Sequence, residues 1–181
     1  MKARTFDGKK ITIRELKPSD IKNARKFQDF INSLVAEDAM ISRDKKVSLK
    51  EEINWLKNTI KAIKKKRTVY LVAESDKTII GTTEVALSLK GRQSHVAGLG
   101  ISIRKGYRRI GLGKQLMSNI IKLAKRKLKP KPKMIRLSVL SKNKPAMELY
   151  QKFGFKKVAK IPRQYQYKGR LIDEIVMISE L

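Results

Sequence analysis

The sequence contains no cysteine, which excludes disulfides, thiolate zinc sites and a cysteine nucleophile. A chain without thiols fits a reducing compartment, and we expect a cytoplasmic protein. Long apolar runs are also absent, because no stretch approaches the roughly 20 residues of a membrane-spanning helix. Residues 1–8 begin with positive charge but lack the apolar run of a secretory signal peptide. We therefore expect no membrane association, and we predict no metal site.

Acidic residues are few in comparison with basic ones. The chain carries 16 Asp and Glu against 44 Lys and Arg, so its formal net charge is +28 at pH 7. A positive field of this size attracts polyanions such as nucleic acid, a ribosome or a phosphorylated cofactor. A solvated lysine-rich surface without a specific partner accounts for the same charge equally well, so both interpretations stay open.

The rest of the composition, 41% hydrophobic and 33% charged, indicates one globular domain spanning residues 1–181. Alternating and helical apolar spacings define its elements. Strands are predicted at residues 10–14, 69–73, 78–87, 99–103, 135–139, 158–161 and 172–178. Helices are predicted at residues 18–35, 49–63, 112–124 and 143–153. This order of hairpins and crossovers predicts an α/β protein with a mixed sheet and helices on both faces.

The most informative segment is the glycine-containing loop of residues 104–111, which joins a predicted strand to a predicted helix. Backbone N–H groups at the start of a helix are unpaired and carry partial positive charge, so they can hold a phosphate. Glycine lets phosphate oxygens approach the backbone, because it has no Cβ atom. Arg108, Arg109 and Lys114 add cationic side chains at the same place. The loop is therefore a candidate pyrophosphate site.

Two other phosphate-binding motifs do not fit this loop. Leu116 stands where a dinucleotide-binding fold needs its third glycine, and Leu112 stands where a P-loop needs its lysine. What remains is Arg108-x-x-Gly111-x-Gly113. This pattern resembles the Gln/Arg-x-x-Gly-x-Gly/Ala signature of the GNAT superfamily of N-acetyltransferases.

A second motif extends the resemblance toward the C-terminus. Residues 137–139 form a predicted strand, Asn143 follows, and residues 146–155 spell Ala-Met-Glu-Leu-Tyr-Gln-Lys-Phe-Gly-Phe. This half is similar to the strand, Asn and Ala-x-x-Leu-Tyr-x-x-x-Gly-Phe helix of the same superfamily. The two motifs stand in the usual order and separation, and the whole resembles the ribosomal-protein-alanine and protein N-acetyltransferase branch.

The resemblance implies an α+β GNAT fold with a mostly antiparallel sheet of about seven strands and about four flanking helices. In that fold the fourth and fifth strands are parallel and splay apart. The pantetheine arm of acetyl-CoA would lie in the gap against the fourth strand, and the pyrophosphate would lie on the glycine loop. The implied contacts are Ile101, Ser102, Ile103, Arg108, Arg109, Ile110, Gly111, Leu112, Gly113, Lys114, Asn143 and Tyr150.

The same resemblance implies that an amine attacks the thioester directly, with Tyr150 as the acid for the departing thiolate. The proton of the amine requires a base. The strand glutamate of many relatives maps to Gly98 and Ser138, and neither can serve. Glu84 is the substitute that we select as a catalytic residue. His95, the one histidine, and a water chain to solvent are the alternatives.

The acceptor is predicted to be an amine on a protein, either an N-terminus or a lysine. A strongly basic enzyme repels polyamines and aminoglycosides unless its pocket is locally acidic. The first alternative is a small-amine acetyltransferase, and the second is a non-catalytic basic module that binds a ribosome or nucleic acid. The aromatic residues that we expect near the acceptor are Phe27, Phe30, Tyr165 and Tyr167.

Overall fold

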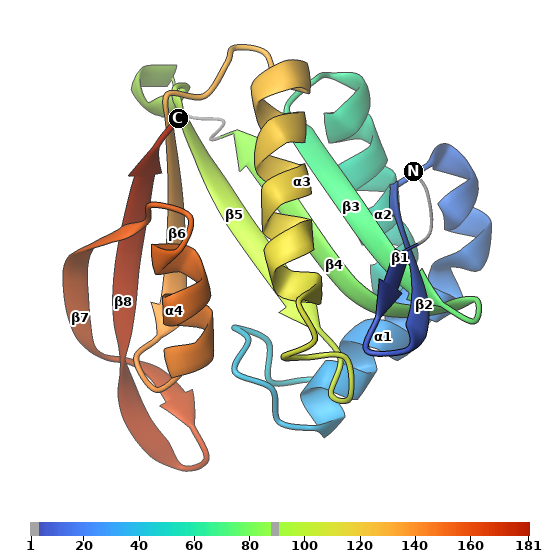
Figure 1. Cartoon of the computed structure of the whole chain (residues 1–181), viewed down its shortest axis with the longest axis horizontal. Helices are drawn as coiled ribbons and strands as arrows, with labels where there is room; N and C mark the ends of the chain where they lie inside the picture. The colour runs from blue at the N-terminus through green and yellow to red at the C-terminus, as the bar shows by residue number, and fades with distance from the viewer. Residues whose placement is uncertain (1–3, 88–90) are drawn as a thin grey trace.

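A computed structural model describes residues 4–87 and 91–181 (Figure 1). The strands are β1 (Arg4–Phe6), β2 (Lys9–Glu15), β3 (Thr68–Ser75), β4 (Thr78–Leu87), β5 (Val96–Ile103), β6 (Met134–Leu140), β7 (Lys156–Tyr167) and β8 (Arg170–Glu180). The helices are α1 (Ala24–Ala36), α2 (Leu49–Lys64), α3 (Leu112–Lys127) and α4 (Lys144–Gln151), with short 3-10 turns η1 (Pro18–Asn23) and η2 (Gly91–Gln93). The predicted order of elements is confirmed.

All strands belong to one sheet, in the order β1-β2-β3-β4-β5-β6-β8-β7. Every neighbouring pair is antiparallel except β5 and β6, which are parallel. The predicted mixed, mostly antiparallel sheet is therefore confirmed. It has eight strands rather than about seven, because the short β1 pairs with β2 at the N-terminal edge. β1 was missed because its three residues are too few to show an alternating pattern.

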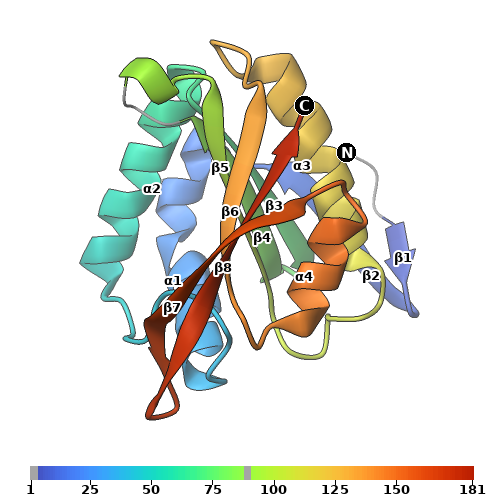
Figure 2. The same cartoon turned by 90° about the vertical axis from the view of Figure 1, so that its left-hand side faces the viewer.

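Helices cover both faces of the sheet, as Figure 2 shows, with α1 and α2 on one side and α3 and α4 on the other. The alternation of side chains along β3 explains this arrangement. Val69 and Leu71 belong to the apolar core under α3, whereas Tyr70 and Val72 belong to the core under α1 and α2. Each fully buried aliphatic side chain contributes about 1.5–3 kcal/mol. No helix within the described residues is long and apolar enough to cross a membrane.

Most elements differ from their predicted bounds by one to three residues, and two differ by more. The first helix begins as the 3-10 turn η1, in which the Asp20 carboxylate accepts the Lys17 N–H at 2.7 Å and pairs with Arg14. β7 is much longer than the predicted strand at 158–161. It lies at the edge of the sheet and is exposed along most of its length, so its sequence needs no apolar alternation.

The parallel strands β5 and β6 separate soon after they meet. Residues 96–98 pair with residues 134–136, and no further pair follows. In Figure 1 the two strands diverge from this contact toward the loop at the start of α3. Alternate backbone groups of residues 99–103 therefore face the gap without a strand partner. The predicted splay is confirmed, with β5 and β6 as the fourth and fifth strands of the family fold.

Candidate active site

The loop of residues 104–111 carries β5 into α3 by a left-handed backbone. Gly106 has a φ of +83° and Gly111 a φ of +88°, a region that favours glycine. Gly111 is the N-cap of α3, and no side chain at this position accepts a hydrogen bond from the first N–H groups of the helix. The first N–H groups of α3 therefore remain available to an anion at the positive end of the helix. The geometry fits the pyrophosphate of acetyl-CoA.

The second glycine of the motif serves close packing. A Cβ atom on Gly113 would lie 3.2 Å from Cδ2 of Leu149 and 3.5 Å from Cδ1 of Ile103. Gly113 thus allows the start of α3 to approach α4 and β5 closely. Sequence reasoning gave both glycines the same purpose, phosphate approach. The structure adds a separate reason for each, since Gly111 is needed for its φ and Gly113 for its lack of a side chain.

The cations of the loop fall into two groups. Nε of Arg108 donates to the Ile103 carbonyl at 2.7 Å, and its guanidinium forms a hydrogen-bonded ion pair with Glu37 at the end of α1. Glu37 also accepts the Lys105 N–H at 3.1 Å. Arg108 therefore fixes the shape of the loop. Arg109 and Lys114 are exposed on the same segment and supply the charge that faces solvent.

Replacing Glu37 with glutamine is expected to raise the KM for acetyl-CoA about 3- to 10-fold and to leave kcat within about twofold. The substitution weakens charged hydrogen bonds worth about 1–1.5 kcal/mol that order the loop without touching the reacting atoms. Steady-state kinetics with varied acetyl-CoA measure the effect. Glu15→Gln is the matched control, because it removes a similar ion pair with Lys127 elsewhere. An unchanged KM with a reduced kcat would contradict this positioning role.

The N-terminal hairpin supports the loop from outside. Nζ of Lys9 donates to the Gly106 carbonyl at 2.6 Å and lies 4.8 Å from the centre of the Tyr107 ring. The Phe6 ring would lie 3.9 Å from a Cβ atom on Gly111. This support was not predicted, because it depends on the pairing of β1 with β2.

The other predicted cofactor residues contribute mainly backbone. Ile101 and Ile103 pack against the core under α3, and Ser102 lines a cavity on the opposite face of the sheet. Leu112 is buried, and Ile110 packs against the same core. For these apolar residues, the groups that can meet a ligand in the gap are peptide N–H and C=O groups.

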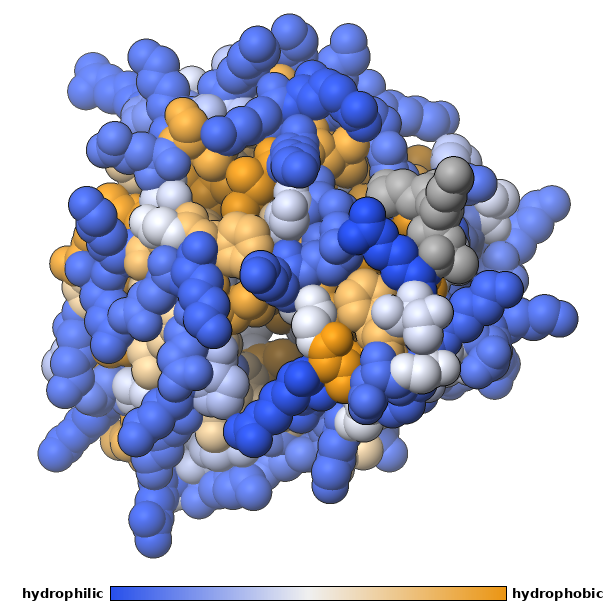
Figure 3. Space-filling view, in the orientation of Figure 1, coloured by the Kyte–Doolittle hydropathy of each residue, from blue (hydrophilic) through white to orange (hydrophobic). Residues whose placement is uncertain are grey.

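α4 holds Asn143 and Tyr150, and Figure 3 shows the surface hollowed between α4 and the start of α3. Oδ1 of Asn143 accepts the Ala146 N–H at 3.3 Å, so this side chain caps the helix. Tyr150 is 6% exposed, and its ring centre lies 6.0 Å from that of Phe155. Burial raises the pKa of Tyr150 to about 12. The phenol therefore keeps its proton at neutral pH and can donate a hydrogen bond.

A second part of the site is a cavity of about 230 Å³ between the sheet and the helices α1 and α2. Its lining residues are Phe27, Phe30, Ile31, Arg43, Val47, Glu51, Glu52, Trp55, Tyr70, Thr82, Thr83, Glu84, Gly100, Ile101 and Ser102. The cavity therefore reaches the free stretch of β5 from the face of the sheet that α1 and α2 cover. Phe27 and Phe30, which sequence reasoning expected near the acceptor, line this cavity. Tyr167 instead donates from its hydroxyl to the Asp38 carbonyl at 2.9 Å.

Glu84 enters this cavity from β4. It stands opposite Gly100 of β5 in the antiparallel register. A Cβ atom on Gly100 would lie 3.7 Å from Oε1 of Glu84, so the carboxylate lies directly beside the open strand. Burial raises the pKa of Glu84 above the ordinary carboxylate value. A carboxylate with a raised pKa next to the splayed strand suits a general base.

The alternative base lies elsewhere. His95 precedes β5 at the end where β5 and β6 still pair, and its carbonyl accepts the Lys133 N–H at 2.9 Å. It does not line the described cavity that contains Glu84. Gly98 and Ser138 are exposed positions on the two parallel strands and carry no carboxylate. Of the two side chains that sequence reasoning named as substitutes, Glu84 lines this cavity and His95 does not.

Sequence reasoning missed Glu52 and Arg43. Glu52 is 7% exposed on α2, and burial raises its pKa to about 7 although the charge of Arg43 acts in the opposite direction. A signal for Glu52 was present, because it lies three residues after Leu49 and four before Leu56 on the apolar stripe of that helix. A charged residue on such a stripe indicates a buried polar site.

Replacing Glu52 with glutamine is expected to increase the free energy of unfolding at pH 8 by on the order of 1–2 kcal/mol. Because the folded pKa is raised, the folded state binds the proton more tightly, and stability falls as pH rises from about 4.5 to about 7. The variant has no carboxylate here to cause this fall in stability, so its free energy of unfolding should exceed that of the wild type only slightly at pH 4. Urea unfolding at both pH values tests it, with exposed Glu148→Gln as control. An equal gain at both pH values would refute the titration argument.

A model of the acetyltransferase (GNAT) family matches residues 31–155, which is more than half of the chain. The chain belongs to the GNAT family of acyltransferases. Its splayed strands, glycine loop and α4 are thus those of a GNAT protein.

Among similar proteins, the L-amino acid N-acetyltransferase AaaT of Escherichia coli (strain K12) is 32% identical over 85 residues. That match covers 47% of this chain and 51% of AaaT, so the chain spans about half the length of this curated relative. A GNAT acetyltransferase from Streptococcus pneumoniae is 26% identical, with a TM-score of 0.82 over 94% of this chain and 99% of that chain.

YncA from Salmonella typhimurium, solved with its cofactor acetyl-CoA, shares the fold of this GNAT protein. The identity is 21%, and the TM-score is 0.78 over 94% of each chain.

Proposed function

We propose that the protein transfers the acetyl group of acetyl-CoA to the amine of a small dipolar acceptor of the α-amino-acid class. The observation that carries this proposal is the composition of the 230 Å³ cavity. Glu51, Glu52 and Glu84 supply carboxyl groups that can pair with an ammonium group, and Arg43 supplies positive charge for a carboxylate. Trp55 and the two phenylalanines of α1 give the same cavity an apolar wall.

The carboxyl groups of the cavity remove the objection that a strongly basic protein would repel a small cationic acceptor. A basic protein repels a cationic small molecule, but a pocket with three glutamates is locally acidic and can hold one. The volume also suits a single amino acid better than a folded protein segment. The relative AaaT, named for its action on L-amino acids, supports the same acceptor class.

Each of these residues has a separate role in the proposed acetyl transfer. Acetyl-CoA supplies an acyl group activated as a thioester. Glu84 takes the proton from the ammonium group, so that the nitrogen lone pair can form the new C–N bond. The C–S bond breaks, the nitrogen loses its second proton to solvent to leave the neutral amide, and the Tyr150 hydroxyl donates a hydrogen bond to the departing thiolate sulfur. Backbone groups of β5 hold the acyl donor in line, and the start of α3 holds its pyrophosphate.

A protein amine is the second candidate acceptor. The net charge of +28 favours an amine carried on an acidic protein or a ribosomal particle. The cavity then would receive an N-terminal residue or a lysine side chain, which presents the same ammonium group to Glu84.

An acceptor screen tests both candidates. CoA release is measured with the twenty amino acids, their amides, polyamines and N-terminal peptides. We expect turnover with free amino acids and a large loss with their amides, because the amide cannot pair with Arg43. An Arg43→Gln variant should raise the KM for the acid and leave the amide unaffected. Turnover confined to peptides would transfer the proposal to a protein acceptor. No turnover with any amine would support a non-catalytic module.

A further inference from the structure

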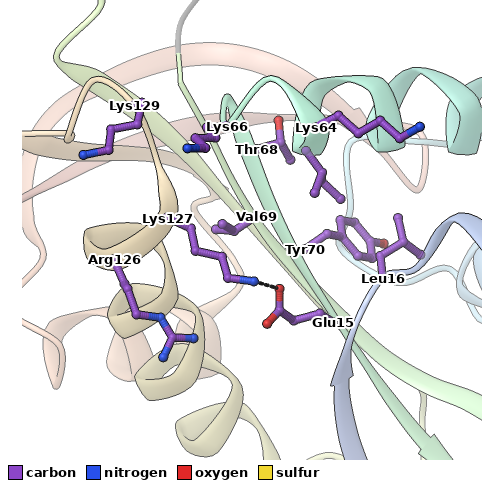
Figure 4. Close-up of a pocket in the computed structure, with 11 residues that line it drawn as sticks. Glu15, Leu16, Lys64, Lys66, Thr68, Val69, Tyr70, Arg126, Lys127 and Lys129 are labelled. Carbon is purple, nitrogen blue, oxygen red and sulfur yellow. Dashed lines mark hydrogen bonds and ion pairs between the residues drawn. The ribbon is translucent and has the colours of Figure 1, made fainter.

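A larger cavity lies at the other end of α3. It has a volume of about 380 Å³ and opens between the C-terminal ends of α2 and α3, beside the end of β2 and the start of β3 (Figure 4). α3 has 16 residues, so at about 1.5 Å per residue its two ends lie roughly 24 Å apart. The cavity is therefore separate from the glycine loop, and no step of the acetyl transfer uses it.

Cationic residues dominate the lining of this cavity. They come from the end of α2, the turn after it and the end of α3: Lys64, Lys66, Arg126, Lys127 and Lys129. Glu15 is the one carboxylate among the lining residues, and it pairs with Lys127 at 2.6 Å, a contact drawn in Figure 4. Leu16, Ile63 and Val69 provide an apolar floor. The lining thus combines an excess of positive charge with apolar surface.

Helix dipoles account for only part of this charge. Cations are favoured in the last turn of a helix, which explains Lys64, Arg126 and Lys127. Lys66 and Lys129 lie beyond the helix ends. Lys66 has a φ of +57°, at a position after a helix where glycine is the usual residue.

Main-chain bonds hold these two lysines at the rim. The Lys66 N–H donates to the Ile63 carbonyl, and the Lys129 N–H donates to the Lys66 carbonyl, each at 2.9 Å. Figure 4 shows the two side chains extending to the same side of the cavity. The backbone therefore holds two neighbouring lysines beyond the last turns of α2 and α3, where the helix dipoles do not explain their charge.

We propose that this cavity binds a nucleotide unit, with its phosphates on the rim cations and its base over the apolar floor. The volume lies within the roughly 300–1,000 Å³ of ligand pockets. Phosphate is the anion that several lysines and an arginine bind together. A free nucleotide and a nucleic-acid strand share this chemistry, so the experiment separates these two sources.

The test compares two variants that lose the same charge. Lys66→Gly with Lys129→Gln removes the rim pair, and glycine relieves the left-handed backbone at position 66, so the fold is retained. Lys156→Gln with Lys157→Gln removes two exposed lysines from β7, at the opposite edge of the sheet. Binding of ATP and of a short oligouridylate is measured by calorimetry at about 0.15 M salt, where diffuse attraction is screened.

We expect one binding event that weakens about tenfold or more in the rim variant and less than about twofold in the β7 variant. Acetyl-CoA kinetics should be unchanged in both. If the wild type binds ATP and the rim variant does not, the ligand is a free nucleotide. If the wild type binds only oligouridylate and the rim variant loses that binding, the ligand is a nucleic-acid strand. Equal weakening in the two variants, or no binding of either probe, would overturn the proposal.

Discussion

Replacing Glu84 with glutamine is expected to lower kcat by roughly 10²- to 10⁴-fold, the usual contribution of a positioned general base. Glutamine has nearly the same shape and fills the space beside Gly100, but it cannot accept the proton of the ammonium group. Glu51→Gln is the matched control, because it removes a carboxylate from the same cavity while glutamine keeps the capping box of α2.

The pH profile gives this prediction a second readout. Burial raises the pKa of Glu84, so kcat/KM for the wild type should rise with pH through an apparent pKa above the ordinary carboxylate range. The Glu84→Gln variant should lose that rising limb. If the variant keeps both its rate and its profile, the base is elsewhere, and a proton path through solvent becomes the better account.

The Tyr150→Phe change is expected to lower kcat by about 10²-fold and to leave the KM for acetyl-CoA nearly unchanged. A phenol with a pKa of about 12 is a much weaker acid than a thiol with a pKa of about 8.5. Tyr150 therefore stabilises the departing thiolate by hydrogen bonding instead of transferring its proton completely. The loss should lie at the lower end of the range for acid–base groups.

Phenylalanine keeps the buried ring against Phe155, so the thermal midpoint should change little. Tyr165→Phe on β7 is the control, since that hydroxyl does not line the cavity that holds Glu84. Retention of activity within about twofold in Tyr150→Phe would leave this tyrosine a packing role only.

Local chemistry explains which parts of the site were predictable from the sequence. A strand, a glycine loop and a helix start lie within about a dozen residues, so the predicted pyrophosphate site depends on one continuous segment. Asn143 and Tyr150 follow from the same kind of local pattern on α4. The two splayed strands came from the family resemblance, and the pairing that stops after Gly98 confirms them.

Long-range pairing explains what the sequence left open. The choice between Glu84 and His95 depends on the register of β4 against β5, which no short pattern specifies. Glu37 meets Arg108 across 71 positions of sequence, so its hold on the loop appears only in the folded chain. Arg43 lies between two helices, in a segment without periodicity, and only the cavity reveals its neighbours.

The chain has one tryptophan, Trp55, and it lines the cavity that holds Glu84, with its ring centre 5.4 Å from that of Tyr70. Tyr70 is the one described residue that lines both cavities. Intrinsic fluorescence excited at the indole therefore comes from a single known position, without labelling or mutation. An acceptor that displaces water from the indole should shift the emission directly. A ligand in the 380 Å³ cavity contacts Tyr70 and can affect the same fluorophore through that ring, so the spectrum reports whether the two cavities communicate.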